Sequence, residues 1–85
     1  MIITRTPNPN AMKFSAGRAL VDGPGRTYHS QLDASGDAIA EPLFGIAGVT
    51  SVFMVADFVT VIKTPEASWD ALLPPITSLL EAALA

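Results

Sequence analysis

The chain has 85 residues, 49% of them hydrophobic and only 15% charged, with no cysteine and a formal net charge of −3. This length predicts a single domain covering residues 1–85, and the apolar composition excludes a disordered chain. The absence of cysteine excludes a thiolate nucleophile, a redox cysteine pair and cysteine ligation of zinc or an iron–sulfur cluster. The net negative charge and the scattered basic residues argue against nucleic acid as a partner.

Membrane insertion and secretion are also not expected. No stretch approaches the roughly 18 uninterrupted apolar residues that a membrane span requires. The opening MIITRTPNPN lacks the basic segment and the following apolar segment of a signal peptide. We therefore expect a cytoplasmic protein with no membrane partner.

The N-terminal part predicts two short strands joined by a rigid connection. Residues 2–6 are β-branched and apolar, and Ala11–Phe14 alternate in character, as strands do. Between them, Pro7 and Pro9 restrict their own backbone and that of the preceding residues, which predicts a turn or a stiff extended loop. Residues 15–26 are irregular, and residues 27–31 are strand-like only at their start.

Residues 37–46 predict a short helix. The Asp37 side chain is a suitable N-cap, and apolar residues then fall near one helical face. Pro42 disfavours a helix interior, so the helix either starts later, with Pro42 in its first turn, or is bent. Gly45 and Gly48 favour an end nearby.

The C-terminal half predicts a hairpin and a long helix. Two apolar, β-branched runs at residues 49–56 and 58–62 predict strands joined by a tight turn at 56–57. Ser68 is a suitable N-cap for a helix with a regular apolar stripe. Pro74 and Pro75 interrupt that stripe, which predicts a kink or a short turn before a second helical segment.

Together these elements predict an α+β fold in the order β-β-α-β-β-α. The expected architecture is a two-layer sandwich, in which a mostly antiparallel four-stranded sheet carries both helices on one face.

Few residues offer catalytic or metal-binding chemistry. His29 is the only histidine, and its neighbour Ser30 would point to the opposite face of a strand, so no nucleophile–base pair is expected and the chain is predicted not to be an enzyme. Asp33, Asp37 and Glu41 are spaced by four. An iron or other metal site formed by His29 with such acidic residues is therefore kept as an alternative.

The segment from Thr6 to Phe14 admits two interpretations. Its prolines and asparagines exceed what is needed to join two strands. A rigid, amide-rich loop loses little entropy on binding, so it suits recognition of a partner. The other interpretation is a loop that is merely stiff.

The same segment carries a resemblance to a known family. Residues 6–14, TPNPNAMKF, resemble the opening signature of the Nfu/NifU-type N-terminal domain of iron–sulfur cluster scaffold proteins. Residues 43–49 are similar to that family's LFxIxGV segment, and residues 52–63 to its VFxxxDFITVxK hairpin. Trp69 and the residues after it are similar to its WxxLxPxI helix. The resemblance spans almost the whole chain, in the family's order.

The resemblance implies an accessory role in iron–sulfur cluster assembly or delivery. In full-length members the cluster is held by a separate C-terminal domain with a CxxC motif, so this chain is expected to be a stand-alone version without scaffold activity. The implied role is contact with a scaffold, a cluster carrier or an apo-target, and no cofactor is bound through cysteine. Weak iron association follows only from the family, and an interaction role in another pathway is a further alternative. The partner-binding residues expected are Thr6, Pro7, Asn8, Pro9, Asn10, Met12 and Lys13, with Met54 and Asp57 as a second candidate.

Two departures from the family pattern affect these expectations. Pro42 lies further inside the first helix than in the family pattern, and the hairpin turn lacks its common glycine. Met54 and Val55 are more apolar than a solvated turn, which predicts an exposed patch for a partner or for self-association.

Overall fold

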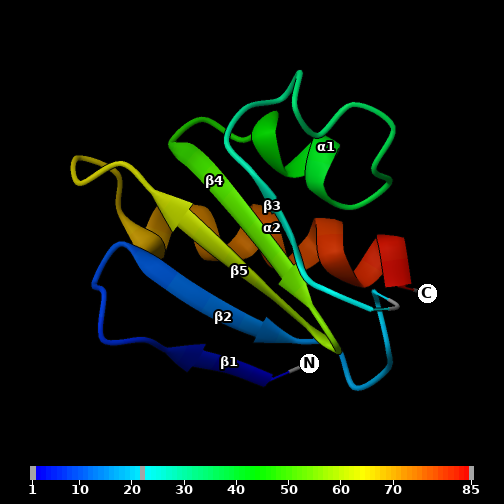
Figure 1. Cartoon of the computed structure of the whole chain (residues 1–85). Helices are drawn as coiled ribbons and strands as arrows, with labels where there is room; N and C mark the ends of the chain where they lie inside the picture. Colours follow the sequence, from blue (N-terminus) through cyan, green and yellow to red (C-terminus); the bar gives the residue numbers. More distant parts are fainter. Residues whose placement is uncertain (1, 22, 85) are drawn as a thin grey trace.

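The computed structural model describes residues 2–21 and 23–84, apart from the side chain of residue 84. Within them the chain forms five strands and two helices, arranged as a sheet with one helical layer (Figure 1). The predicted α+β class with an antiparallel sheet and two helices is therefore confirmed. In chain order the elements are β1 (Ile2–Arg5), β2 (Ala11–Ser15), β3 (Arg26–Tyr28), α1 (Ala40–Phe44), β4 (Val49–Val55), β5 (Phe58–Lys63) and α2 (Trp69–Leu84).

The prediction of four strands in the order β-β-α-β-β-α is wrong, because a fifth strand, β3, precedes α1. β3 has only three residues, too few to show a period of two in the sequence. It pairs with β4, with Thr27 opposite Phe53, and so extends the sheet beyond the central hairpin. The strand order is β1-β2-β5-β4-β3, and every neighbouring pair is antiparallel.

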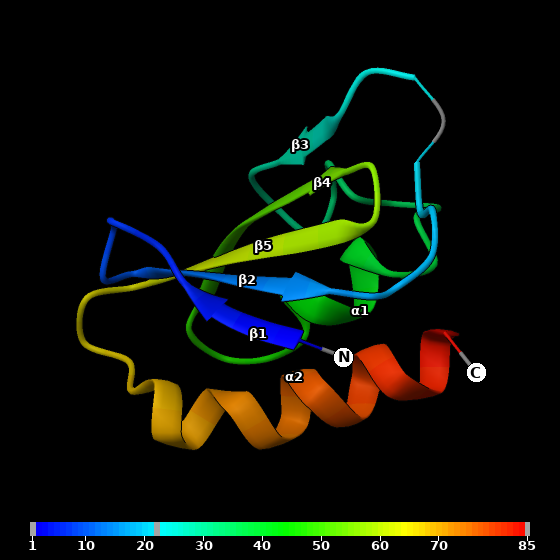
Figure 2. The ribbon, with the colours of Figure 1, turned by 90° about the horizontal axis from the view of Figure 1, so that it is seen from below.

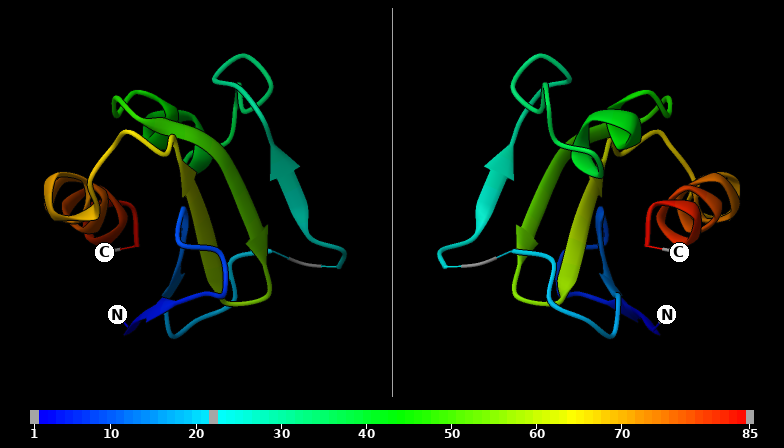
Figure 3. Two further views of the ribbon diagram at one scale, coloured as in Figure 1. Left: turned by 90° about the vertical axis from the view of Figure 1, so that its left-hand side faces the viewer. Right: turned by 90° about the vertical axis from the view of Figure 1, so that its right-hand side faces the viewer.

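Both helices lie on the same side of the sheet (Figure 2). Successive strand residues point to opposite faces, and the register places Met12 opposite Val61 and Val61 opposite Val52 on the helical side. Figure 3 shows α2 running along this side, with α1 near the β3–β4 edge. The core cluster comprises Met12, Phe14, Val21, Ala34, Ala40, Leu43, Val52, Met54, Val59, Val61, Leu72, Ile76 and Leu80.

The short helix α1 resolves the alternatives for Pro42. The helix begins at Ala40, so Pro42 lies in its first turn, where a missing amide hydrogen costs little. Asp37 does not occupy the N-cap position, which belongs to Ile39. Its carboxylate nevertheless accepts hydrogen bonds from the amides of Ile39 and Ala40, at 2.9 and 2.8 Å.

The long helix α2 is a single helix, so the predicted division into two segments at Pro74 and Pro75 is wrong. Both prolines are exposed, while the buried positions Leu72, Ile76 and Leu80 follow a spacing of four on the other face. Each proline lacks the amide hydrogen that would bond to the carbonyl four residues earlier in the helix. Because the prolines lie on the exposed face, these two carbonyls face water, which can hydrogen-bond to them. Among the residues described, no helix has the length and apolar character needed to cross a bilayer.

The β4–β5 turn is a two-residue turn at residues 56–57, as predicted, with Val55 opposite Phe58. Ala56 adopts a φ of 51°, a left-handed conformation that normally favours glycine. The Ala56 carbonyl accepts the amide of Leu20 at 2.8 Å, which helps to hold this conformation.

Replacing Ala56 with glycine is expected to stabilise the protein by about 0.5–1 kcal/mol, because glycine adopts a positive φ without steric cost. Chemical denaturation would measure the change in the free energy of unfolding. Ala38→Gly, at an exposed alanine without this positive φ, is the control and should not stabilise the protein. A destabilised Ala56→Gly variant would contradict the prediction.

Candidate functional site

The loop between β1 and β2 is held by its own hydrogen bonds. The Thr6 hydroxyl oxygen accepts the amide of Asn8 at 3.2 Å and lies 2.9 Å from the Asn8 carbonyl oxygen. The Asn8 side-chain oxygen accepts the amide of Asn10 at 2.9 Å, and the Asn8 carbonyl accepts the amide of Ala11 at 3.0 Å. Since Pro7 also fixes its own φ, few torsions in this loop remain free.

Two residues from the distant end of the chain anchor the same loop. The Trp69 indole N–H donates to the Pro9 carbonyl at 2.9 Å. The Lys63 ammonium donates to the Asn10 side-chain oxygen at 3.0 Å and to the Thr64 carbonyl at 3.2 Å. Lys63 is only 8% exposed, and its ammonium lies 5.8 Å from the centre of the Trp69 ring. The loop is thus stiff and is also fixed to the start of α2.

A small hollow opens beside this anchored loop. Its volume is about 180 Å³, below the roughly 300 Å³ at which pockets for small molecules begin. The residues that line it are Arg5, Thr6, Pro7, Asn8, Pro9, Ala11, Met12 and Trp69.

The structure brings only part of the predicted partner-binding set together. Residues 6–9 line the hollow, whereas the Asn10 side chain is directed to Lys63. Lys13 lies on the helix-free face of the sheet, with its ammonium 4.2 Å from the centre of the Phe58 ring. Asp57 is exposed in the β4–β5 turn, near the end of β2 away from the loop.

Two methionines of that set belong to the core, although Met12 also lines the hollow. Met12 is 5% exposed and Met54 is 2% exposed. The prediction that Met54 and Val55 form an exposed patch is wrong, because Met54 points to the helical side of the sheet and Val55 is half-buried. Residues 52–55 are apolar on both faces of the strand, so their sequence does not reveal which residues face inward.

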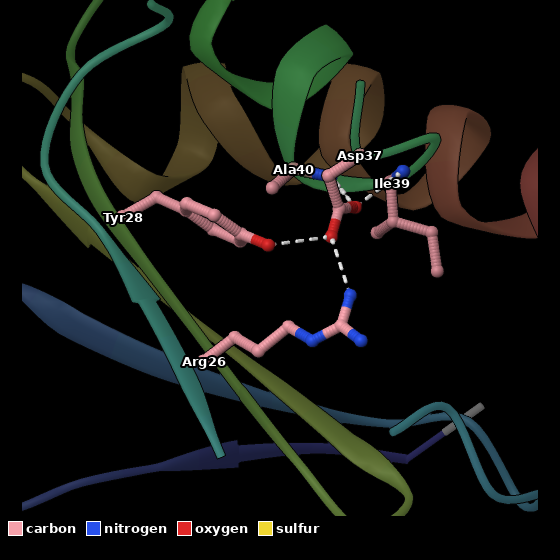
Figure 4. Close-up of polar contacts among 5 residues, drawn as sticks. All are labelled: Arg26, Tyr28, Asp37, Ile39 and Ala40. Atoms are coloured by element: carbon pink, nitrogen blue, oxygen red, sulfur yellow. Dashed lines mark hydrogen bonds and ion pairs between the residues drawn. The ribbon is translucent and has the colours of Figure 1, made fainter. Parts of the chain in front are cut away.

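The acidic residues of the alternative metal site have other partners. One Asp37 oxygen accepts two backbone amides, and the other accepts the Tyr28 hydroxyl at 3.0 Å and lies 3.9 Å from the Arg26 guanidinium (Figure 4). Asp33 accepts the backbone amide of His29 at 3.1 Å. Among residues 2–21 and 23–84, no three histidine or acidic side chains are grouped as metal ligands. The geometry gives Asp37 a structural role.

The surroundings of Asp37 set its protonation. Burial raises the pKa of this carboxyl, but the hydrogen bonds from Ala40 and Ile39, with Tyr28 and Arg26, outweigh burial and hold the pKa below its ordinary value of 3.8. Burial, followed by the hydrogen bond to Asp37, raises the pKa of Tyr28 above 10.0, so its hydroxyl remains a donor at neutral pH.

Asp37 is expected to contribute to acid sensitivity. Since its pKa is lower in the folded state, its stabilisation is complete above the ordinary value of 3.8 and is lost as the pH falls through the folded-state pKa. The unfolding free energy of Asp37→Asn should therefore depend less on pH below that value than the wild type's. Urea denaturation at pH values above and below 3.8 measures the difference, and Asp33→Asn is the control. Parallel pH profiles of the unfolding free energy for wild type and Asp37→Asn would contradict the prediction.

Three residues that line the hollow or anchor the loop were not recognised as part of this site from the sequence. Arg5 is the last residue of a strand, and nothing in its immediate sequence distinguishes it from other surface cations. In the sequence, Lys63 and Trp69 stand out only as parts of segments that resemble the family. Their contacts with the loop join residues 53 and 60 positions apart.

Comparison with known proteins agrees with this architecture. The family model described as "Scaffold protein Nfu/NifU N terminal" matches residues 1–85. The chain belongs to the Nfu/NifU N-terminal family. A solved structure of the protein SAV1430 from Staphylococcus aureus superposes with a TM-score of 0.83 and 32% identity, over 93% of this chain and 94% of that one.

Curated relatives are considerably longer than this chain. The "NifU-like protein 5, mitochondrial" of Arabidopsis thaliana is 35% identical over 75 residues, which cover 88% of this chain and 27% of the relative. The "Conserved virulence factor C" of Staphylococcus saprophyticus is 39% identical over 75 residues, covering 88% of this chain and 20% of the relative. The chain thus spans between a fifth and three tenths of these two relatives.

Proposed function

We propose that this Nfu/NifU N-terminal chain is a non-catalytic interaction domain in iron–sulfur cluster assembly or delivery. It docks a cluster carrier or an apo-target through the loop surface, defined as the exposed parts of Thr6–Asn10 with Arg5 and Trp69. Family membership supports the pathway, and the anchored loop beside its hollow supports the mode of action. Cytoplasmic localisation stays a prediction, since the plant relative is named as mitochondrial.

The single observation that carries this proposal is the fixed conformation of the loop. Its backbone is satisfied internally and by Trp69, so little conformational entropy is lost when a partner binds. Holding two partners close would raise their effective concentration without any chemical step in this chain. The alternative of a metal protein gains no support from the side chains around His29 and Asp37.

Removing one wall of the hollow tests the proposal. Pro7 is exposed, lines the hollow and donates no hydrogen bond, so Pro7→Ala should cost only the entropy that proline removes from the unfolded chain, about 0.4–1 kcal/mol or about 2–8 °C in melting temperature. It should weaken binding to a CxxC-bearing Nfu-type scaffold about fivefold, which corresponds to about 1 kcal/mol. Isothermal titration calorimetry measures the affinity.

Pro24→Ala provides a matched control, because Pro24 is also exposed but lies outside the loop surface. Its affinity for the scaffold should equal the wild type's. Equal affinities for all three proteins, or equal losses in both variants, would contradict docking through the loop surface.

A further inference from the structure

The strand β1 is an open edge of the sheet. Among the strands that the structure describes, it pairs only with β2, so the hydrogen-bonding groups on its outer side have no partner strand. Figure 2 shows β1 in front of the other strands, with no helix drawn across it. Its sequence, Ile-Ile-Thr-Arg, has no proline and only one charged residue, at its end. The edge therefore lacks the usual protection against pairing with another strand.

The opposite edge of the sheet, β3, is better protected. It has only three residues, and it begins with the charged Arg26. Tyr28 and Arg26 are both directed to the Asp37 carboxylate, which ties β3 to the segment before α1. Short edge strands and charged side chains both disfavour the addition of a strand. Of the two edges, β1 is thus the one suited to pairing.

Each face of β1 carries an exposed isoleucine. Ile3 lies on the helical side, opposite Phe14, yet it is 42% exposed while Phe14 is 1% exposed. The helical layer therefore does not extend over β1. Ile2 lies on the helix-free face, opposite Ser15, and is 68% exposed. A strand added at this edge would cover both isoleucines.

We propose that two copies of the chain pair through β1, in an antiparallel arrangement about a two-fold axis that passes beside Ile3, perpendicular to the sheet. Directly opposite residues of antiparallel strands point to the same face, which limits the registers allowed. The proposed register places Ile3 opposite Ile3 of the second copy. It also places Ile2 opposite Thr4, and these two residues share the helix-free face.

The neighbouring allowed register fits less well. An axis beside Thr4 would place Ile3 opposite Arg5 and would leave Ile2 with no opposite residue within the strand. In the register centred on Ile3, both isoleucines face β-branched side chains, and such cross-strand pairs stabilise a sheet. The apolar residues of the edge thus select this register.

A second copy is the occupant that the edge itself matches. In a two-fold contact the same four residues supply both sides, so every exposed group of β1 meets a group of β1. The two Arg5 residues lie four steps apart along the strands, about 13–14 Å, which exceeds the screening length of about 8 Å at physiological salt. Four residues a side are far fewer than the 20–30 of a standard interface, so we expect a dissociation constant on the order of 10–100 μM.

The dimer goes beyond the proposed function and does not depend on it. Because the paired strands run in opposite directions, the two loop surfaces lie at opposite ends of the contact. A dimer therefore presents two docking sites at once, and a partner with two matching sites would bind more tightly to the dimer than to one copy.

Sedimentation velocity of the whole chain, from about 5 μM to 1 mM, tests the dimer on both sides of the expected dissociation constant. We expect the mass to rise from one chain to two, while the outward-facing amides of β1 exchange more slowly at high concentration. Ile3→Lys and Ile3→Glu each bring two like charges to about 5 Å across the axis, so each variant alone should remain monomeric. An equimolar mixture of the two variants should dimerise, because opposite charges then meet.

Leu32→Lys is the matched control. Leu32 is also an exposed large hydrophobic residue, at 86%, but it lies outside β1. This variant receives the same charge as Ile3→Lys and should dimerise like the wild type. Circular dichroism checks that each variant is folded. Should the Ile3 variants not fold, the concentration dependence of β1 hydrogen exchange in the wild type decides the question.

Four results would overturn the inference: a wild type that is monomeric at 1 mM, a dimer in either Ile3 variant alone, a mixture that stays monomeric, or protection on the helix-free face instead of β1. The outcomes are separate from those for the proposed function. A monomeric chain whose scaffold binding is weakened by Pro7→Ala retains the docking function without the dimer. A dimer that does not bind the scaffold retains the edge contact without the docking function.

Discussion

Replacing Phe14 with alanine is expected to lower the free energy of unfolding by about 3–5 kcal/mol. Phe14 is 1% exposed and lies in β2, opposite Ile3 on one side and Val59 on the other, so its ring fills the space between the sheet and the helices. A chain of 85 residues has a total stability of about 4–13 kcal/mol, so this loss would remove a large share of it. Urea denaturation, monitored by circular dichroism, measures the change.

Phe53→Ala is the matched control for this experiment. Phe53 lies on the helix-free face, where it is half-buried and contacts Phe58 edge to face, with ring centres 6.3 Å apart. Phe53→Ala should lower the free energy of unfolding by only about 1–2 kcal/mol, since Phe53 buries less apolar surface than Phe14 and its site can remain hydrated. Equal losses for the two variants would show that the core does not lie on the helical side of the sheet.

Replacing Lys63 with alanine is expected to lower the free energy of unfolding by about 2–4 kcal/mol and to make the loop more mobile. The substitution removes two hydrogen bonds from a charged donor and leaves the Asn10 side-chain oxygen without its partner. It also removes an aliphatic stem that is largely buried. Denaturation measures the stability, and amide hydrogen exchange at residues 8–11 reports whether the loop becomes mobile.

Two further variants identify the cause of this effect. Lys63→Met retains most of the packing but not the donor, so it should still accelerate hydrogen exchange in the loop while recovering part of the stability. Lys13→Ala, on the opposite face, removes a cation that lies over Phe58 and should cost only about 0.5–1 kcal/mol with no change in the loop. Unchanged loop exchange in both Lys63 variants would contradict the anchoring role of this residue.

The sequence indicated the local elements of this fold better than their orientation. The tight turn at 56–57 and the Ser68 cap follow from short-range chemistry, and the structure confirms both, with the Ser68 hydroxyl accepting the Asp70 amide at 3.2 Å. The inward direction of Met54 could not be predicted, because residues 52–55 are apolar on both sides of the strand. The added strand β3 is too short to carry a periodic signal.

The candidate site was only partly predictable for a related reason. The prolines and asparagines of residues 6–10 indicate a rigid loop by themselves. Its anchors, Lys63 and Trp69, come from the far end of the chain, and their contacts exist only after the sheet and α2 have packed. The exposure of β1 likewise depends on the strand order, which is a property of the whole sheet.

The most direct test of docking through the loop surface is an NMR titration of the isotope-labelled chain. A cluster-loaded, CxxC-bearing Nfu-type scaffold and its apo form are added in turn, and the amide and Trp69 indole signals are followed. The docking model predicts shifts concentrated at residues 5–10 and at the Trp69 indole, with the 56–57 turn and Phe53 unaffected. Unchanged spectra at high scaffold concentration, or shifts confined to the helix-free face, would contradict it.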